Sequence, residues 1–308
     1  NAAHSHYGVC LRMILFMNPN PVFGEPSWTI QSSQVRVSVT CRGGHTAPVV
    51  FKLGQKKFAP FSVAPWSVIH DRKLPPIIQF LRGDFFCMPF GTSPEPFHGE
   101  RHPVHGDPPN LKWLLVSARQ GRDGAQLHVR LRTRTRRGQV DKHLQLIDGH
   151  AAVYCRHVVS GMKGPMTIGH HAILDFTDRP AVISTSPFDF GQVYPGRFDD
   201  PEAGAYSSLK PDAEFTSLEP VPLANGGATD ASRYPNRPGF EDALQMQSKP
   251  VQGLGWTAAT FSGERVVWFG LKDKSVLPGT LLWFSNGGRH MPPWSGVHRN
   301  RCGLEEVC

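Results

Sequence analysis

The chain has 308 residues, of which 39% are hydrophobic and 19% are charged. This is the composition of an ordinary soluble globular protein, and it excludes a largely disordered chain. The 31 glycines and 28 prolines favour turns and argue against long helices. The formal net charge of +8 suits an anionic ligand, but no motif that reads a nucleic-acid groove accompanies it. We therefore expect no nucleic-acid partner.

Residues 1–25 read as a poorly specified leader that ends in the turn-rich run Asn18–Pro21. The apolar run Met13–Met17 is too short to span a membrane, and it lacks the basic flank and cleavage site of a signal peptide. We expect no membrane partner, and a cytoplasmic location follows by default. Residues 26–308 are predicted to form a single β-sandwich domain, a length that large all-β domains reach.

The chain contains six cysteines without any Cys-x-x-Cys spacing: Cys10, Cys41, Cys87, Cys155, Cys302 and Cys308. In a chain of this length, such scattered cysteines are typical of reduced core residues. We do not expect a disulfide framework.

Strand patterns begin at Trp28. Residues 34–40 alternate polar and apolar side chains, and Gly43-Gly44 then turns the chain into residues 48–51. The clearest pattern covers residues 127–136. One face carries Leu127, Val129, Leu131, Thr133 and Thr135, and the other carries His128 and four arginines. We interpret the arginine row as the solvated face of a strand, with a phosphate- or nucleic-acid-binding stripe as the alternative.

Further strands are predicted at residues 114–116, 151–154, 181–184, 265–269 and 280–284, separated by clusters of Gly, Pro, Asp and Asn. Residues 219–240 form a long Pro/Gly-rich segment, which is either a functional loop or a flexible linker. No sustained helical periodicity is present. The sequence therefore predicts an all-β fold with many strands, in a sandwich.

Three histidines, His98, His102 and His105, lie in the segment 96–107. On a helix their spacing would suit a metal, but the prolines and glycines among them forbid a stable helix. A loop that presents neutral imidazoles to a polyhydroxy ligand is the better interpretation, because imidazole both donates and accepts hydrogen bonds.

Two pairs of adjacent residues carry acid–base chemistry: His170-His171 and Glu305-Glu306. Neighbouring residues of a strand point to opposite faces, so one member of each pair enters a given pocket. A buried glutamate needs a partner, and a histidine or a sugar hydroxyl would serve. A glutamate base and a histidine acid together form a proton-transfer site.

Two further side chains are candidates for substrate binding. Arg82 lies in an apolar segment, where it either pairs with Asp84 or clamps sugar oxygens. Trp294 lies in a Pro-Pro-Trp-Ser-Gly loop, which favours packing against a sugar ring over a place in the core.

Together these segments resemble the aldose 1-epimerase (galactose mutarotase-like) superfamily over residues 28–308. His102-Pro103-Val104-His105-Gly106, with Trp113 downstream, resembles the family's His-Gly substrate loop. Residues 168–173 resemble its Gly-x-His strand, and Gly303-Leu304-Glu305 resembles its C-terminal Gly-Leu/Ile-Glu element. The order Arg, His, His, Glu also agrees. Ala172-Ile173 and Glu306 depart from the family pattern.

The resemblance implies an antiparallel β-supersandwich of the galactose mutarotase type and an enzyme that interconverts sugar anomers. Glu305 would be the base and His171 the acid, and neither a metal nor an organic cofactor is needed. The substrate, a monosaccharide or sugar derivative, would be held by Arg82, His105, Trp294 and an aspartate, either Asp242 or Asp189. A monomer or homodimer is expected. The alternatives are a non-catalytic carbohydrate-binding protein and a metal-dependent sugar isomerase or lyase using His98, His102 and His105.

Overall fold

The structure is a computed structural model that describes residues 17–69, 73–92, 95–200, 202, 204–248 and 252–308. Strands make up nearly all of its regular structure, with a short helix α1 (Pro76–Gln79) and a 3-10 turn η2 (Ser262–Glu264). Every strand pair in the described residues is antiparallel except for an isolated bridge. The predicted all-β class is confirmed.

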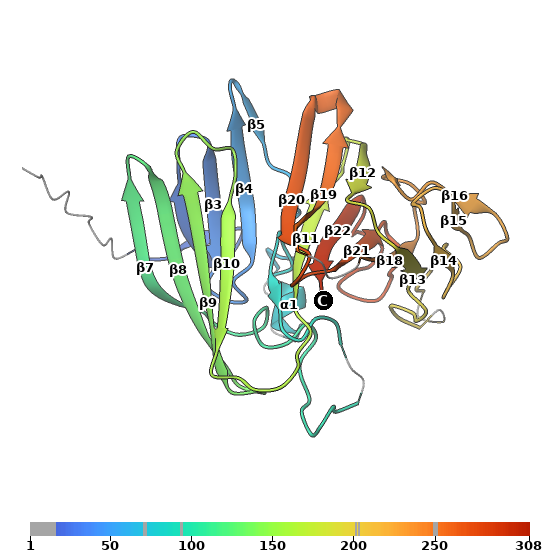
Figure 1. Cartoon of the computed structure of the whole chain (residues 1–308), viewed down its shortest axis with the longest axis horizontal. Coiled ribbons are helices and arrows are strands. Elements are labelled where there is room, and N and C mark those ends of the chain that lie inside the picture. Colours follow the sequence, from blue (N-terminus) through green and yellow to red (C-terminus); the bar gives the residue numbers. More distant parts are fainter. Residues whose placement is uncertain (1–16, 70–72, 93–94, 201, 203, 249–251) are drawn as a thin grey trace, which may run out of the picture.

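The N-terminal half of the described chain forms a sandwich of two sheets, which we call the first sandwich (Figure 1). Its five-stranded sheet is, in spatial order, β1 (Asn20–Val22), β2 (Glu25–Gln31), β3 (Val35–Thr40), β4 (Thr46–Leu53) and β5 (Lys56–Phe58). Its four-stranded sheet is β10 (Tyr154–Ser160), β9 (Gly138–Ile147), β8 (Gly124–Thr133) and β7 (Leu114–Gly121). One apolar cluster, with Trp28, Val37, Leu127 and Val129 among its members, fills the space between them.

A second sandwich is built around a seven-stranded sheet, which lies on the right in Figure 1. The order of its strands is β14 (Glu214–Phe215), β13 (Phe190–Val193), β18 (Glu241–Gln247), β21 (Gly279–Ser285), β22 (Arg301–Val307), β11 (Gly169–Asp175) and β6 (Phe86–Cys87). The facing sheet is β17 (Arg233–Tyr234), β12 (Ala181–Thr185), β19 (Leu254–Phe261) and β20 (Val266–Asp273). Their shared cluster includes Ile183, Phe261, Leu282 and Leu304.

The alternation read from residues 127–136 holds over most of its length. Leu127, Val129 and Leu131 are buried, so the apolar face of β8 is the predicted one. The strand ends at Thr133, because the chain turns there into the β8–β9 hairpin. The predicted strand at 151–154 begins only at its last residue, where β10 starts.

The segment 219–240 is more ordered than a loop or linker. It contains the small hairpin of β15 (Val221–Pro222) and β16 (Ala228–Thr229), and then β17. Its Tyr234 is buried in the second sandwich, and the hydroxyl donates to the backbone oxygens of Ser285 and Arg301. This aromatic anchor was not recognised among the prolines and glycines.

The predicted leader 1–25 lies partly outside the described residues. Within its described part, β1 begins at Asn20 and pairs with β2, so residues 20–25 belong to the first sheet. Among the described cysteines all are free, three of them buried, as predicted for reduced residues. No helix in the described ranges is long and apolar enough to cross a membrane.

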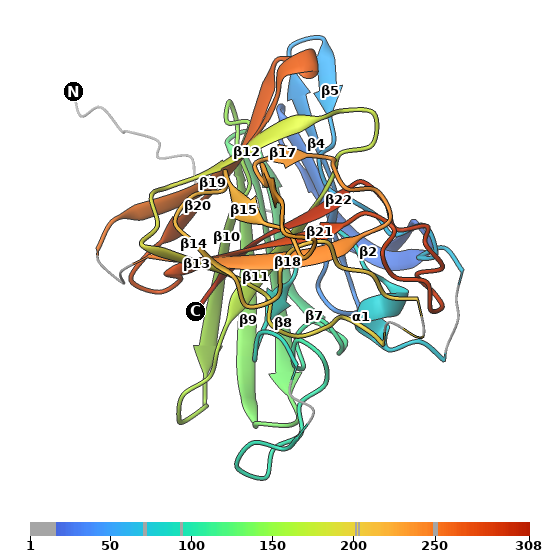
Figure 2. The ribbon, with the colours of Figure 1, turned by 90° about the vertical axis from the view of Figure 1, so that its right-hand side faces the viewer.

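The two faces of the seven-stranded sheet differ in what covers them (Figure 2). One face packs on the four-stranded sheet through the cluster that contains Leu174 and Leu304. The other carries Ile173 and Trp283, which pack with residues of the connecting segments, among them Trp66. This second face, which we call the loop-covered face, carries the candidate site.

Candidate active site

His171 and Glu305 lie side by side on the loop-covered face. They are direct partners in the antiparallel register of β11 and β22, so their side chains emerge from the same face of the sheet. Nε2 of His171 lies 3.2 Å from Oε1 of Glu305, and the two side chains are only 7% and 2% exposed. A histidine from mid-chain and a glutamate about 130 residues later thus form a buried acid–base pair.

Aromatic rings fix the position of the His171 imidazole. Phe85 stacks on it with ring centroids 4.5 Å apart, and His105 approaches edge-on at 5.0 Å. Trp283 also meets it edge-on, at 5.6 Å, and Phe90 lies at 6.3 Å. Because aromatic rings surround the imidazole, the local dielectric around the pair is low. Electrostatic interactions between His171 and Glu305 are therefore stronger than they would be in water.

Burial shifts both members of the pair toward their neutral forms. It raises the pKa of Glu305 well above its ordinary value, and the charge of Asp84 adds to this effect. It lowers the pKa of His171 well below its ordinary value, with a further contribution from His105. Among the described residues, neither Oε1 of Glu305 nor Nδ1 of His171 has a hydrogen-bond partner. Both atoms therefore keep unused hydrogen-bonding capacity.

His105 is held as a neutral hydrogen-bond donor. Its Nδ1 accepts from the backbone N–H of Gly91 at 3.2 Å, so the ring proton resides on Nε2. Burial lowers the pKa of His105 to about 4. The following Gly106 is required by close approach, since a Cβ there would lie 1.8 Å from the carbonyl oxygen of Met88.

A second carboxyl group borders the site through Trp283. The indole Nε1 donates to Oε1 of Glu241 at 2.7 Å, and the Ser285 hydroxyl donates to Oε2 at 3.0 Å. Burial raises the pKa of Glu241 to about 8. The ring of His298 stacks on Trp283 at 5.5 Å. Glu241 and His298 were not identified from the sequence, because only the pairing of β18 with β21 brings Glu241 to this face, and His298 lies in a loop without a strand pattern.

Two predicted substrate residues are not brought to the pair. Asp242 is the neighbour of Glu241 and faces the opposite side of the sheet, where its carboxylate accepts from the backbone N–H groups of Ser208 and Leu209. Arg82 is fully buried, and its guanidinium donates to three backbone carbonyls, those of Val22, Phe23 and Phe80. In both cases the hydrogen bonds of the side chain go to the protein itself.

Trp294 contacts Trp283, and Trp283 in turn contacts His171 of the acid–base pair. Trp294 is 4% exposed and packs edge-on against Trp283 at 6.0 Å and against Trp66 at 4.8 Å. The guanidinium of Arg289 lies over the ring of Trp294, 4.0 Å from its centroid. Direct stacking of Trp294 on a sugar stays a prediction, and the ring that contacts His171 is that of Trp283.

The three loop histidines do not form a metal site in the described part of the chain. His102 pairs with Glu100 at 3.0 Å, while His105 belongs to the site above. Two other groups in the described residues have the ligand atoms and spacing for a metal. They are Cys155–His157–His170 and His128–Asp141–His143.

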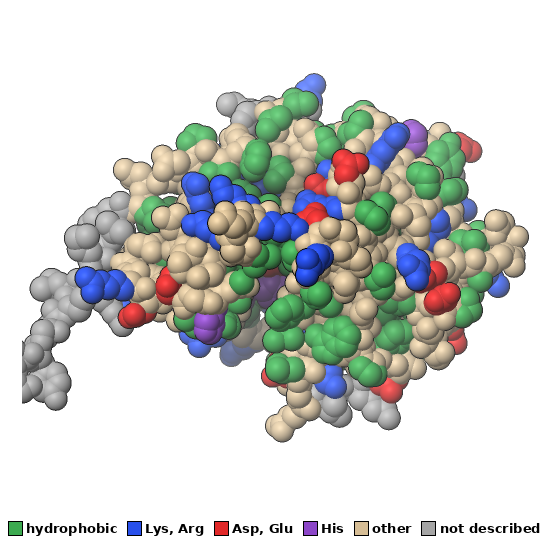
Figure 3. Space-filling model, turned by 90° about the horizontal axis from the view of Figure 1, so that it is seen from above, with side chains coloured by type: hydrophobic (Ala, Val, Ile, Leu, Met, Phe, Trp, Pro, Cys, Tyr) green, Lys and Arg blue, Asp and Glu red, His purple; other side chains and the backbone are tan. Residues whose placement is uncertain are grey.

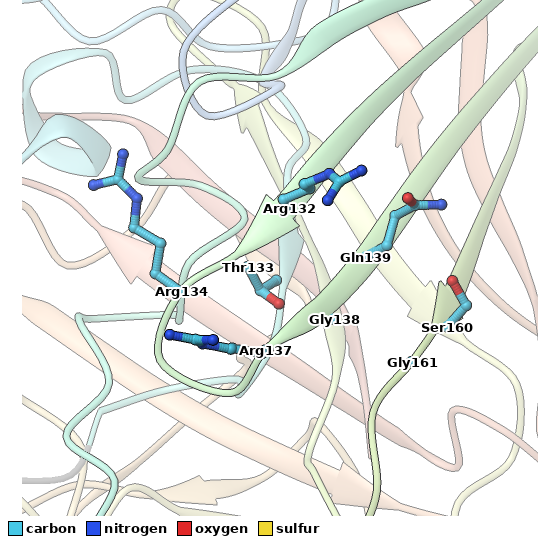
Figure 4. A pocket seen from close by; sticks show the side chains of 8 residues that line it. All are labelled: Arg132, Thr133, Arg134, Arg137, Gly138, Gln139, Ser160 and Gly161. Atoms are coloured by element: carbon cyan, nitrogen blue, oxygen red, sulfur yellow. The ribbon is translucent and has the colours of Figure 1, made fainter.

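A cavity of about 640 Å³ lies elsewhere, at the end of the β8–β9 hairpin, and is lined by Arg132, Arg134 and Arg137 (Figure 4). Figure 4 shows Arg132 and Arg134 pointing away from each other, so they do not converge on one anion. On the face drawn in Figure 3, basic side chains are interspersed with acidic and apolar ones. The different directions of Arg132 and Arg134 in Figure 4 favour the interpretation of the arginine row as a solvated face.

Comparison with known proteins identifies the architecture. No family model matches the chain, and no curated protein matches it either. Among solved structures, a provisionally named mutarotase (YeaD) of Salmonella typhimurium superposes with a TM-score of 0.55 at 12% identity, over 96% of this chain and 88% of that one. A provisionally named aldose 1-epimerase of Escherichia coli K12 gives a TM-score of 0.53 at 13% identity, over 92% and 88%. The chain has the aldose 1-epimerase-like fold. The antiparallel supersandwich expected from the resemblance is thereby confirmed.

Proposed function

We propose that the protein is an aldose 1-epimerase-type isomerase that interconverts the anomers of a monosaccharide or sugar derivative. The observation that carries the proposal is the contact between Nε2 of His171 and Oε1 of Glu305, on neighbouring strands of the loop-covered face. The likeness to solved structures with mutarotase and aldose 1-epimerase names supports the substrate class. The chemistry needs one proton removed and one supplied, which a glutamate base and a histidine acid can do.

In the proposed reaction, the Glu305 carboxylate takes the proton of the C1 hydroxyl while the His171 imidazolium gives a proton to the ring oxygen. The bond between C1 and the ring oxygen breaks, and an open-chain aldehyde forms. Rotation about C1–C2 and reclosure with the proton movements reversed yield the other anomer. In the open-chain state Glu305 is protonated and His171 is neutral, which is the arrangement that burial favours.

The surrounding groups would bind the sugar by complementary means. The Nε2 proton of His105 can be donated to a sugar oxygen, since its Nδ1 is already engaged by Gly91. The faces of Phe90 and Trp283 can pack on C–H groups of the sugar ring. The Glu241 carboxyl, bonded to the Trp283 indole, holds that ring in place.

Polarimetry tests the proposal. Fresh α-glucose and α-galactose are mixed with the wild type, with His171→Ala and with Glu305→Gln, and the uncatalysed rate is subtracted. We expect each substitution to lower the catalysed rate about 100-fold or more, the usual contribution of a general acid or base. Glu214→Gln, at an exposed position of β14 in the same sheet, is the matched control and is expected to retain full activity.

Two outcomes would overturn the proposal. Full activity in either pair variant would show that the pair is not the catalyst. Binding of a sugar by calorimetry without acceleration of anomer exchange in the wild type would instead identify a carbohydrate-binding protein.

A further inference from the structure

The inner face of β11, opposite to the proposed catalytic pair, carries a second cluster of reactive side chains. Cys155 and His157 come from β10, and His170 comes from β11, next in sequence to His171. Their potential ligand atoms all lie within 4.8 Å of one another. The ring contact between His157 and His170 brings β10 of the first sandwich against β11 of the second sandwich.

We propose that Cys155, His157 and His170 bind a transition-metal ion of the Zn²⁺ class at this junction. The inference is independent of the proposed sugar chemistry, which uses the other face of β11 and needs no metal.

The backbone presents the three side chains to one point. Cys155 and His157 are two residues apart in a strand, so both project from the same face of β10. His170 projects from β11 on the face opposite to His171, toward β10. The rings of His157 and His170 have centroids 4.9 Å apart, and Sγ of Cys155 lies 3.9 Å from Nδ1 of His157.

The distances suit an ion with only a small adjustment. Zinc binds thiolate sulfur at about 2.3 Å and imidazole nitrogen at about 2.0 Å, so ligand atoms in a tetrahedral site lie about 3.3–3.7 Å apart. Atoms that already lie within 4.8 Å of one another need to approach by about 1.5 Å at most, which small side-chain rotations can provide.

A carboxylate supports one of the proposed ligands from behind. Oδ2 of Asp84 lies 3.3 Å from Nδ1 of His170, which leaves Nε2 of that ring for the ion. Metal-bound histidines characteristically donate their second ring proton to such a carboxylate, which fixes the ring and strengthens it as a ligand. Asp84 was one predicted partner of Arg82, and the structure pairs it with His170 instead.

The second histidine is also held in place while keeping a nitrogen available. The ring of His157 stacks on Phe86 at 4.2 Å, with Trp113 edge-on at 6.4 Å. Its Nε2 is buried and has no hydrogen-bond partner among the described residues. The nitrogen that faces Sγ of Cys155, at 3.9 Å, is Nδ1, so Nδ1 is the nitrogen that this geometry offers to an ion.

The donor set selects the kind of ion. A thiolate and two imidazoles favour Zn²⁺, Co²⁺ or Cu⁺ over Mg²⁺ or Ca²⁺, which prefer oxygen ligands. The nearby Lys142 opposes a cation, but its ammonium donates to Gly44 O and Thr46 Oγ1. Once an ion has displaced the thiol proton of Cys155, its thiolate and the Asp84 carboxylate would supply two compensating negative charges.

The other metal-capable group is a weaker candidate. Oδ1 of Asp141 already accepts from Arg130 at 2.7 Å and contacts His128 at 2.5 Å. An arginine held on the same oxygen competes with a cation, whereas no arginine contact is found on Cys155, His157 or His170 in the described part of the chain.

Metal titration of the full chain tests the proposal. After treatment with EDTA, the protein is titrated with Co²⁺ and then with Zn²⁺. We expect one ion per chain and a Co²⁺–thiolate charge-transfer absorption that Zn²⁺ displaces. Cys155→Ser should abolish that absorption, and His157→Ala should weaken Zn²⁺ affinity at least about 10-fold.

Cys308→Ser is the matched control, since Cys308 is the other exposed free cysteine among the described residues, and it should leave binding unchanged. Circular dichroism verifies that each variant is folded. The proposal is overturned if the wild type binds neither ion, if folded Cys155→Ser keeps the absorption, or if His143→Ala rather than His157→Ala removes the ion.

Discussion

The two faces of β11 hold adjacent histidines in opposite chemical settings. His171 meets a glutamate inside a wall of aromatic rings, and burial favours the neutral forms of both partners. His170 meets Asp84; although burial acts to raise the pKa of that carboxyl, the charge of His170 and its hydrogen bond outweigh it and lower the pKa. In the two proposals made above, the same residue type serves proton transfer on one face and ion binding on the other. The surroundings decide which role a histidine has, not its place in the sequence.

The two glutamates of β22 give the strongest test of this comparison. Glu305→Gln should lower anomerase activity about 100-fold or more, while Glu306→Gln should change it little. Glu306 lies on the inner face and is bonded to Thr257, Thr280 and the buried Lys272. Equal losses of activity in the two variants, measured by polarimetry, would contradict the assignment of the faces.

The same Glu306→Gln variant should be less stable than the wild type. Removal of the carboxylate leaves the ammonium of Lys272, which is 4% exposed at its side chain, without its charged partner. We expect the free energy of unfolding to fall by about 2 kcal/mol, the scale of a buried hydrogen bond to a charged group. Urea denaturation of the wild type and of Glu306→Gln measures the difference.

Trp283→Phe sharpens the contrast on the loop-covered face. The substitution keeps an aromatic wall against His171 but removes the donor that bonds Glu241 at 2.7 Å. A loss of stability of about 1–2 kcal/mol is expected, because a buried acceptor is left without one of its partners. An unchanged midpoint in urea would show that the Trp283–Glu241 bond contributes nothing.

Asp84→Asn tests the inner face with a smaller effect. The amide keeps the shape of the side chain but removes the charge that supports His170. Zn²⁺ affinity should fall about 10-fold, the lower end of the range for lost supporting carboxylates. Calorimetry with Zn²⁺ checks this, and affinity equal to the wild type would remove Asp84 from the site.

The buried carboxyl of Glu241 makes the free energy of unfolding depend on pH. The folded-state pKa of Glu241 is about 8 against an ordinary value of 4.5, so between these values the folded protein retains a proton that the unfolded chain releases. This group therefore makes the free energy of unfolding decrease as pH rises from about 4.5 to about 8. Glu241→Gln should flatten that decrease in denaturation measured at several pH values.

The parts of the fold that follow from local pattern were predictable. Alternation in residues 127–133 identified the buried face of β8, and the adjacency rule predicted that only one histidine and one glutamate of the two pairs would enter a given pocket. The short strands of segment 219–240 were not, because two-residue strands carry no period and depend on pairing with distant chain.

In the candidate site, too, the residues that depend on contacts between distant segments were not predicted from the sequence. Asp242 was expected at the pair, yet Glu241 occupies that face, because one position in a strand reverses the direction of a side chain. Arg82 was expected to hold a sugar, but the turn after β1 lies over it and supplies carbonyls for its guanidinium. Both depend on which segments pack together, which neither spacing nor composition records.

The register between β11 and β22 has a consequence for how reliably this molecule must assemble. Sliding the last strand by one position, in the direction that sets Leu304 opposite His171, would put a leucine where the Glu305 carboxyl now stands and turn that carboxyl to the inner face. A sheet with this shifted register would keep most of its backbone hydrogen bonds and yet lose the acid–base pair. The proposed isomerase activity therefore requires the correct register between β11 and β22, and a folded sheet with another register would lack it.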